Sequence, residues 1–210
     1  MDSRKARAVI RIVDDDAGVR ESYKFLVESE GWLARTYPSA EAFLELDDPT
    51  VPGCGIFDVR MTGITGMELH ERLLELSNRL PVIFVSAHGD IEMAVKAMRR
   101  GAIDFLTKPV VDEKLLSSIE MAVSQSFEEI EASVAHDATL EAWKALSPRE
   151  RQVAVLVSEG LMNKVIADRL GIADRTVQVH RSNVCQKLGV KHAVGVSQII
   201  TQLRRLGAIE

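Results

Sequence analysis

Cysteine, aromatic residues and long apolar runs are scarce in this sequence of 210 residues, and each scarcity excludes a class of protein. The two cysteines, Cys54 and Cys185, lie far apart among apolar neighbours, so the sequence predicts neither a disulfide framework nor a zinc site. No apolar run approaches the roughly 20 residues of a membrane-spanning helix, and no long apolar segment follows the basic N-terminus. We therefore expect a cytoplasmic protein with no membrane partner.

The net charge of −5 is divided unevenly along the chain. Residues 1–146 carry 16 Lys and Arg against 26 Asp and Glu, whereas residues 147–210 carry 10 against five. An acidic first part and a basic second part predict two domains with different partners, and a basic domain is typical of nucleic-acid binding. Charge taken alone also fits an ordinary solvated surface.

Short apolar runs alternate with helical patterns between residues 8 and 110, which predicts an α/β domain with a parallel sheet and helices on both faces. Thr65 and Glu68 form a capping box that starts one of these helices. The predicted strands are residues 9–13, 32–36, 54–57, 81–85 and 103–106.

A long helix is predicted over residues 112–135, because its apolar residues recur every three or four positions. It either packs on the sheet and continues into a linker, or pairs at its far end with a second copy of the chain. We assign residues 1–125 to the first domain and residues 126–146 to a helical linker. The apolar stripe consists of Leu116, Ile119, Val123, Phe127, Ile130 and Val134.

An all-helical domain is predicted for residues 147–210. Ser147 and Glu150 form a capping box with Pro148 at the first helical position, which is a strong helix start. A short helix at 163–170 stops at a glycine, and a second helix is expected over 176–188 with Asp174 as its cap. This order of helix, tight turn and helix is the helix-turn-helix pattern.

The second of these helices has two different faces. Val177, Val184 and Leu188 share the apolar face, whereas Gln178 and Asn183 lie on the polar one. Because the second helix of a helix-turn-helix enters the major groove of DNA, these amides are candidates for contact with base edges. A solvated helix face is the alternative.

Acidic and polar residues follow the predicted strands where each strand ends. Ligands of open parallel sheets bind at the carboxyl ends of the strands, so we expect these side chains to converge. Converging carboxylates repel one another unless a cation neutralises them, and oxygen ligands favour Mg²⁺. The residues at these positions are Asp14, Asp15, Asp58, Ser86 and Lys108.

In order and spacing, these five residues and Phe105 resemble the receiver domain of bacterial two-component response regulators, and residues 86–90 and 101–106 resemble its FixJ branch. Residues 146–150, 163–167 and 176–184 resemble the LuxR-type DNA-binding domain. Nearly the whole chain thus resembles a response regulator of the FixJ/NarL family. The resemblance implies a doubly wound, flavodoxin-like five-stranded sheet of order 2-1-3-4-5, followed by a four-helix helix-turn-helix domain.

The resemblance also implies roles for the acidic residues. Asp58 is the phosphoryl acceptor, and it binds Mg²⁺ together with Asp15 and the backbone carbonyl of Arg60. Asp14 acts mainly through a metal-bound water.

Three further residues have roles implied by the resemblance. Lys108 reaches the phosphoryl oxygens, the Ser86 hydroxyl swings onto the phosphate, and Phe105 follows this motion inward. Two residues depart from the family pattern, because Thr62 stands where proline is usual and Val110 where phenylalanine is frequent. The lifetime of the phosphoryl group therefore stays open.

The implied partners are a sensor histidine kinase and double-stranded promoter DNA, with homodimerisation on phosphorylation. RNA polymerase is a further candidate partner, and the FixJ resemblance favours an activator. The family often dimerises through the last helix, here about 192–205. The residues expected to contact DNA are Lys164, Arg175, Thr176, Gln178, Val179, His180, Arg181, Ser182, Asn183 and Lys187.

Two other functions are alternatives. The chain is a DNA-binding regulator controlled independently of phosphorylation if its receiver site does not accept a phosphoryl group. It is a phosphotransferase or aspartyl-phosphate phosphatase if it turns over a substrate, but such phosphatases need a second carboxylate two residues after the nucleophile. Arg60 occupies that position, so we expect no enzyme.

Overall fold

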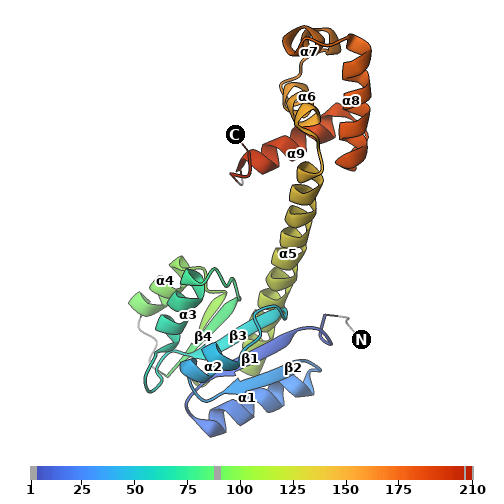
Figure 1. Ribbon diagram of the computed structural model, residues 1–210. Coiled ribbons are helices and arrows are strands. Elements are labelled where there is room, and N and C mark those ends of the chain that lie inside the picture. Colours follow the sequence, from blue (N-terminus) through green and yellow to red (C-terminus); the bar gives the residue numbers. More distant parts are fainter. Residues whose placement is uncertain (1–3, 88–90, 206, 210) are drawn as a thin grey trace. The chain divides into compact units, whose positions relative to one another are not determined.

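The computed structural model describes residues 4–87, 91–205 and 207–209 (Figure 1). Residues 88–90, which belong to the segment that resembles the FixJ branch, lie outside the described part. Five parallel strands form one sheet of order β2-β1-β3-β4-β5, which confirms the predicted topology. Every strand boundary lies within one residue of its predicted position. The strands are β1 (Val9–Val13), β2 (Leu33–Tyr37), β3 (Gly53–Asp58), β4 (Val82–Ser86) and β5 (Asp104–Thr107).

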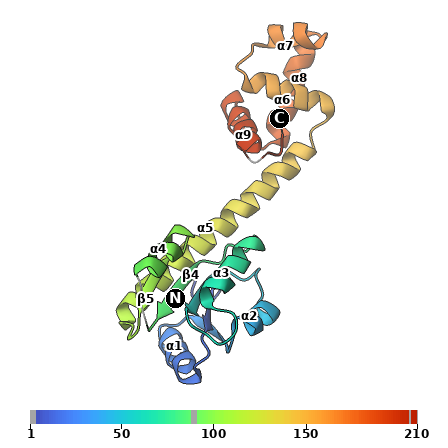
Figure 2. The same cartoon turned by 90° about the vertical axis from the view of Figure 1, so that its left-hand side faces the viewer.

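Helices cover both faces of this sheet (Figure 1 and Figure 2). Because successive side chains of a strand point to opposite faces, each strand contributes to two cores. Ile12 and Ile56 pack against α1 and α5, whereas Val13 and Phe57 pack against the other three helices. The helices are α1 (Ala17–Ser29), α2 (Ala40–Leu46), α3 (Gly66–Glu75), α4 (Ile91–Arg99) and α5 (Asp112–Lys144). The predicted capping box of Thr65 and Glu68 starts α3.

A buried arginine anchors β1 to the loop that follows α2. The Arg11 side chain is 0% exposed, and its Nε lies 2.8 Å from both carboxylate oxygens of Asp47. Tyr37 donates its hydroxyl to Asp47 Oδ1 at 2.7 Å. The rest of the guanidinium donates to the backbone carbonyls of Val9, Asp48 and Val51, at 2.9–3.1 Å. Each of the three guanidinium nitrogens thus donates at least one hydrogen bond.

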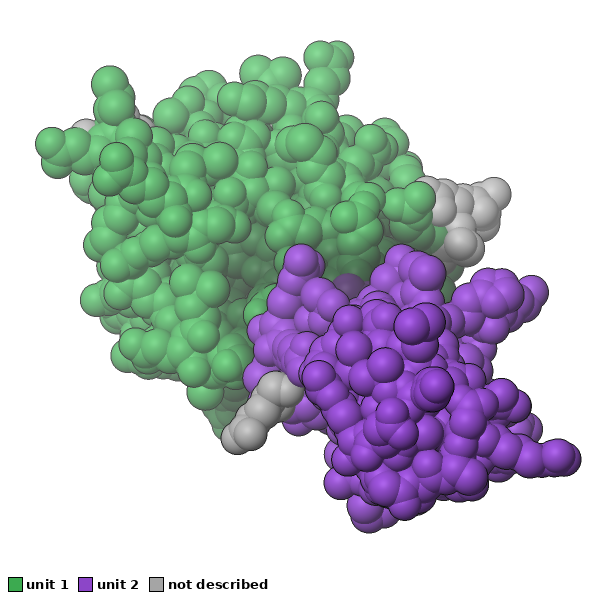
Figure 3. Space-filling model, turned by 90° about the horizontal axis from the view of Figure 1, so that it is seen from above, with its two compact units in different colours: residues 1–131 green, residues 132–210 purple. Residues whose placement is uncertain are grey.

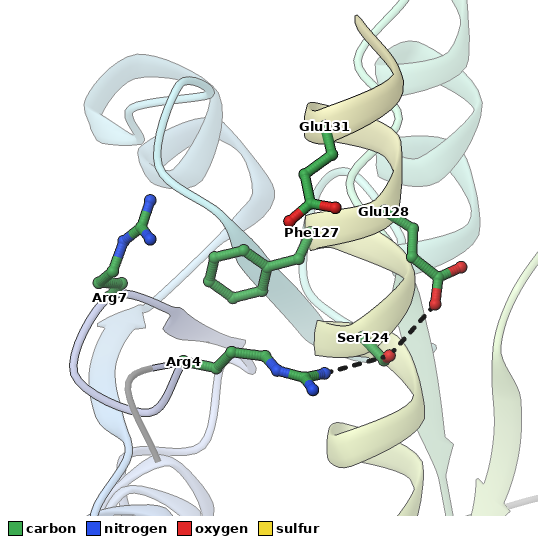
Figure 4. Close-up of a pocket in the computed structure, with 6 residues that line it drawn as sticks. All are labelled: Arg4, Arg7, Ser124, Phe127, Glu128 and Glu131. Atoms are coloured by element: carbon green, nitrogen blue, oxygen red, sulfur yellow. Dashed lines mark hydrogen bonds between the residues drawn. The ribbon is translucent and has the colours of Figure 1, made fainter. Parts of the chain in front are cut away.

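The N-terminal segment lies against α5 (Figure 4). Arg4 Nη1 donates to Ser124 Oγ at 3.3 Å, and the Arg7 guanidinium lies 5.5 Å from the centre of the Phe127 ring. Charges of both signs surround the cavity of about 340 Å³ between them, which is lined by Arg4, Arg7, Ser124, Phe127, Glu128 and Glu131.

The helix α5 is longer than predicted, because it continues to Lys144 instead of ending near residue 135. Residues 112–144 contain neither proline nor glycine, so nothing in the local sequence stops the helix. Ile119 and Val123 are buried against the sheet, whereas Ile130 is 39% and Val134 is 64% exposed. The predicted apolar stripe is therefore only partly used within the chain.

The chain forms two compact units, residues 1–131 and residues 132–210 (Figure 3). The second unit has an all-helical core that includes Val153, Ile166, Val177 and Ile200. Its four helices beyond α5 confirm the predicted domain type, and they are α6 (Pro148–Ser158), α7 (Asn163–Leu170), α8 (Asp174–Lys187) and α9 (Ala193–Arg205). No helix in the described part of the chain has both the length and the hydropathy needed to cross a membrane.

Candidate functional site

The predicted site residues of the first unit gather at the carboxyl edge of the sheet. Asp14 directly follows β1, Asp58 ends β3, Ser86 ends β4, and Lys108 directly follows β5. These four positions come from neighbouring strands, and the sheet register places Asp58 beside β4 and Ser86 beside β5. The parallel topology therefore brings together residues that are far apart in the sequence.

Lys108 links two of the carboxylates. Its Nζ lies 2.7 Å from Asp58 Oδ1 and 2.8 Å from Asp14 Oδ2. Asp58 is 6% exposed and Asp14 is 3% exposed, so both carboxylates are almost completely removed from water. The second oxygen of Asp58 accepts the backbone N–H of Arg60 at 2.7 Å.

The pKa values at this site follow from burial and from the ion pairs. Burial raises the pKa of the Asp58 carboxyl above its ordinary value; the hydrogen bond and charge of Lys108 oppose this rise, and the charge of Asp14 adds to it. Burial lowers the pKa of Lys108, but its bonds to Asp14 and Asp58 outweigh burial and raise the pKa overall. Lys108 is therefore held as a cation between the two buried carboxylates.

Asp15 is exposed and is oriented towards the loop after β3. Its Oδ2 accepts the backbone N–H of Thr62 at 2.9 Å and the Thr62 hydroxyl at 3.0 Å. The backbone bond is the main cause of a lowered pKa at Asp15, and the hydroxyl bond adds to it. From the sequence, Thr62 was only a departure from a family pattern, and its contact with Asp15 was not predicted.

The expected convergence of three carboxylates is not what the structure shows. Among the described residues, no three His, Cys, Asp or Glu side chains form a group that could hold a metal ion. Asp14 and Asp58 instead share the Lys108 ammonium, and the Asp15 carboxylate is hydrogen-bonded to Thr62. The donor chemistry nevertheless suits Mg²⁺, because three carboxylates at adjacent strand ends outnumber the one lysine paired with two of them.

The two predicted switch residues lie beside this site. Ser86 is buried, and its backbone carbonyl accepts the N–H of Lys108 at 2.8 Å, which joins the ends of β4 and β5. Phe105 is half-buried on β5, with its ring centre 6.4 Å from that of Phe84. Ser86 is thus linked through the backbone to Lys108, and Phe105 packs beside β4.

The helix-turn-helix of the second unit consists of α7, a turn at residues 171–173, and α8. Gly171 ends α7 in the left-handed conformation (φ 64°), as a glycine can. The helix α8 begins at Asp174, two residues before its predicted start. Asp174 is therefore in the first turn and is not the cap, which is Ala173 without a side-chain hydrogen bond.

On the polar face of α8 Gln178 is exposed and Asn183 is half-buried, whereas Val177, Val184 and Leu188 on the apolar face are buried. Two predicted DNA contacts have partners within the unit: Gln178 Nε2 donates to Asp174 Oδ2 at 2.9 Å, and Arg181 Nη1 donates to Asn163 Oδ1 at 2.9 Å. Among the residues predicted to contact DNA, the half-buried ones are His180, Arg181 and Asn183. The exposed ones are Lys164, Arg175, Thr176, Gln178, Val179, Ser182 and Lys187.

Lys187 is bound to the scaffold of the second unit. Its Nζ lies 2.7 Å from Glu150 Oε2 and 3.3 Å from the Ala145 carbonyl. Glu150 also accepts the Ser147 N–H at 2.8 Å, as the predicted capping box requires. Lys187 therefore joins α8 to the start of α6, a role that the sequence analysis missed because the partners lie 37 positions apart.

Acid is expected to weaken this link. The hydrogen bonds from Lys187 and Ser147 lower the pKa of Glu150 from its ordinary 4.5 to about 2. A carboxyl with a lowered folded-state pKa stabilises the fold above its unfolded-state pKa, and this stability is lost as the pH falls from 4.5 towards 2. In a Trp32→Phe background, urea unfolding followed by Trp143 fluorescence should show this loss when Glu150 is present and a smaller one in Glu150→Gln. An equal loss in both proteins contradicts the assignment.

Two families match the chain. The "Response regulator receiver domain" matches residues 10–120, and "Bacterial regulatory proteins, luxR family" matches residues 144–200. The first match lies on the α/β unit with the acidic site, and the second covers α6 to α8 and most of α9.

Similar proteins align with this chain over almost their whole length. The transcriptional regulatory protein FixJ of Bradyrhizobium diazoefficiens is 38% identical over 201 residues, which cover 95% of this chain and 96% of FixJ. The response regulator protein TmoT of Ectopseudomonas mendocina is 40% identical over 197 residues, which cover 94% of this chain and 90% of TmoT.

Solved structures agree with this assignment. A low-resolution structure of the response regulator StyR has a TM-score of 0.84 at 41% identity, and the match covers 93% of this chain and 99% of StyR. A crystal structure of full-length FixJ from B. japonicum has a TM-score of 0.57 at 35% identity and covers 97% of this chain and 99% of that one. The chain belongs to the FixJ/NarL family of two-component transcriptional response regulators, with a receiver domain followed by a LuxR-type DNA-binding domain.

Proposed function

We propose that the protein is switched by phosphorylation, with a sensor histidine kinase transferring a phosphoryl group to Asp58. The observation that carries the proposal is the position of the Lys108 ammonium, 2.7 Å from Asp58 Oδ1 and 2.8 Å from Asp14 Oδ2. A lysine held there can meet the oxygens of an incoming phosphoryl group as a point charge.

The chemical step is an in-line displacement at phosphorus. A carboxylate oxygen of Asp58 forms the new bond to phosphorus, and the bond from phosphorus to the donor breaks with its electron pair leaving on the donor. The residues that would hold Mg²⁺ are Asp58, Asp15 and the backbone carbonyl of Arg60, with Asp14 acting through a bound water. The cation would spread the negative charge of the transferring group.

Phosphorylation adds roughly two negative charges and three acceptor oxygens beside Lys108. We expect Lys108 to shift its hydrogen bonds from Asp14 to these oxygens, and the Ser86 hydroxyl to move onto them. The backbone N–H of Lys108 donates to the backbone carbonyl of Ser86 at 2.8 Å. This hydrogen bond would couple the two movements. Phe105 follows inward, and the surface of α4, β5 and α5 changes with it.

The output of the switch is binding to promoter DNA. Gln178 and Val179 are exposed on α8, which supports their entry into the major groove, and the surrounding cations would contact phosphates. We propose that the phosphorylated receiver either pairs with a second copy through the face of α4 and β5 or releases a masked DNA-binding domain. A paired protein reads two half-sites about one helical turn or a multiple apart, and acts as an activator through RNA polymerase.

No turnover of a substrate is proposed. An aspartyl-phosphate phosphatase needs an acid or base beside the acceptor, and the residue two positions after Asp58 is Arg60, whose side chain is exposed. A guanidinium stays protonated and cannot act as that base.

The proposal is tested with the full-length protein, acetyl phosphate and Mg²⁺. Phosphate-affinity electrophoresis is expected to show a retarded species, which elutes earlier in size-exclusion chromatography and binds a duplex selected from a random-sequence library more tightly. A retarded species with unchanged elution and tighter DNA binding supports unmasking rather than pairing. If neither acetyl phosphate nor any histidine kinase of the source organism labels the protein, its receiver works independently of phosphorylation.

A further inference from the structure

Thr62 makes the contact that ties the loop after β3 to the acidic end of β1. Its backbone N–H and its hydroxyl both donate to the same oxygen, Asp15 Oδ2, at 2.9 and 3.0 Å. The two residues are 47 positions apart in the chain. Both side chains are exposed, so the contact is available to any species that approaches Asp15 from solvent.

Two donors on one carboxylate oxygen occupy both of its lone-pair directions. Asp15 Oδ2 can therefore ligate a cation only after it gives up at least one donor from Thr62. Oδ1 is not engaged by Thr62, but the two bonds to Oδ2 fix the direction of the whole carboxylate and offset part of its charge. Thr62 and a divalent cation thus compete for the Asp15 carboxylate.

The residue type at position 62 decides how strong this competition is. A proline has neither a backbone N–H nor a hydroxyl, so it can make neither of the two hydrogen bonds. A valine keeps the N–H and the shape of threonine but loses the hydroxyl. A serine keeps both donors. These three residues therefore provide a graded series at one position.

We propose that Thr62 is a positioning residue that holds Asp15 away from the metal and thereby lowers the affinity of the unphosphorylated receiver for Mg²⁺. The inference rests on the proposed function, because it takes Asp15 and Asp58 as the ligands. Asp15 moves to the cation when the gain from binding exceeds the loss of the two Thr62 hydrogen bonds. Thr62 thus sets the Mg²⁺ concentration at which the site becomes competent for phosphoryl transfer.

The test is calorimetric titration of full-length, unphosphorylated protein with MgCl₂, which needs no phosphodonor and no measurement of activity. Thr62→Val is expected to bind Mg²⁺ about three- to tenfold more tightly, since one hydrogen bond to a charged but exposed group is lost. Thr62→Pro should bind still more tightly, and Thr62→Ser should bind as the wild type does. In an Asp15→Asn background, Thr62→Val should have no effect on the remaining affinity.

Two controls separate the possible failures. Circular dichroism checks that each variant is folded, and Thr62→Val alone keeps the test valid if Thr62→Pro is not. If Mg²⁺ binding is lost in Asp58→Ala but Thr62→Val binds as weakly as the wild type or more weakly, the role of Thr62 is overturned while the metal site stands. If Asp58→Ala binds Mg²⁺ as the wild type does, the metal site itself is overturned, and the inference with it.

Discussion

Replacement of Asp58 by Asn is expected to abolish labelling of the protein by acetyl phosphate in the presence of Mg²⁺. The amide has nearly the shape of the carboxylate, but it lacks the negative oxygen that attacks phosphorus, so no acyl phosphate forms. Lys108 keeps its second carboxylate partner, Asp14, at 2.8 Å, so the loop that carries the lysine should stay in place. Phosphate-affinity electrophoresis of the two proteins under identical conditions measures the effect.

Asp137→Asn is the matched control, because Asp137 is an exposed carboxylate on α5 outside the site. It makes the same change of charge and should be labelled to the extent of the wild type. A retarded band in Asp58→Asn would assign the phosphoryl group to another residue. Loss of labelling in both variants would show that a change of net charge, rather than the loss of the acceptor, is responsible.

Replacement of Arg11 by Ala is expected to destabilise the receiver domain by about 3–5 kcal/mol, which is typical for removing one partner of a buried ion pair. The substitution leaves the Asp47 carboxylate, 6% exposed in its side chain, without the guanidinium that lies 2.8 Å away. It also removes the donor to three backbone carbonyls, and buried acceptors without a donor are costly. A loss of this size is a large share of the stability of a typical domain.

Urea unfolding followed by the fluorescence of Trp32, in a Trp143→Phe background, reports on the receiver alone. Arg99→Ala is the control, because Arg99 is exposed on α4. It should change the free energy of unfolding by less than about 0.5 kcal/mol, as surface substitutions usually do. An effect of Arg11→Ala no larger than that of Arg99→Ala would mean that the buried network contributes little net stability.

The order of elements and the positions of the residues at the strand ends were predictable because both depend on local patterns. Apolar runs of four or five residues, each followed by a polar residue, marked the strands to within one position. Parallel strands have their carboxyl ends at one edge, so Asp58 and Lys108 could be expected to meet although they are 50 positions apart. The capping boxes at Thr65 and Ser147 are equally local, and the structure contains both.

The end of α5 was not predictable from the same patterns. The apolar periodicity put the end of the helix near residue 135, whereas the helix continues to Lys144, through most of the segment assigned to a helical linker. The polarity pattern indicates which residues are buried, and it does not mark where a helix ends. This segment contains no proline or glycine, the residues that most disfavour a helix. The start of α8 at Asp174 was missed by two residues for a related reason, since Asp is common both as a cap and in the first turn.

The sequence by itself determined an α/β part followed by an all-helical part and the set of residues at the strand ends, whereas the sheet order came from the family resemblance. Only the tertiary structure decided which partner each of these side chains has: Lys108 for Asp14 and Asp58, Thr62 for Asp15, and Glu150 for Lys187. The physical reason is that a charged side chain has several candidate partners far away in the sequence. Which of them lies within hydrogen-bond distance is decided only when the strands, helices and loops have packed.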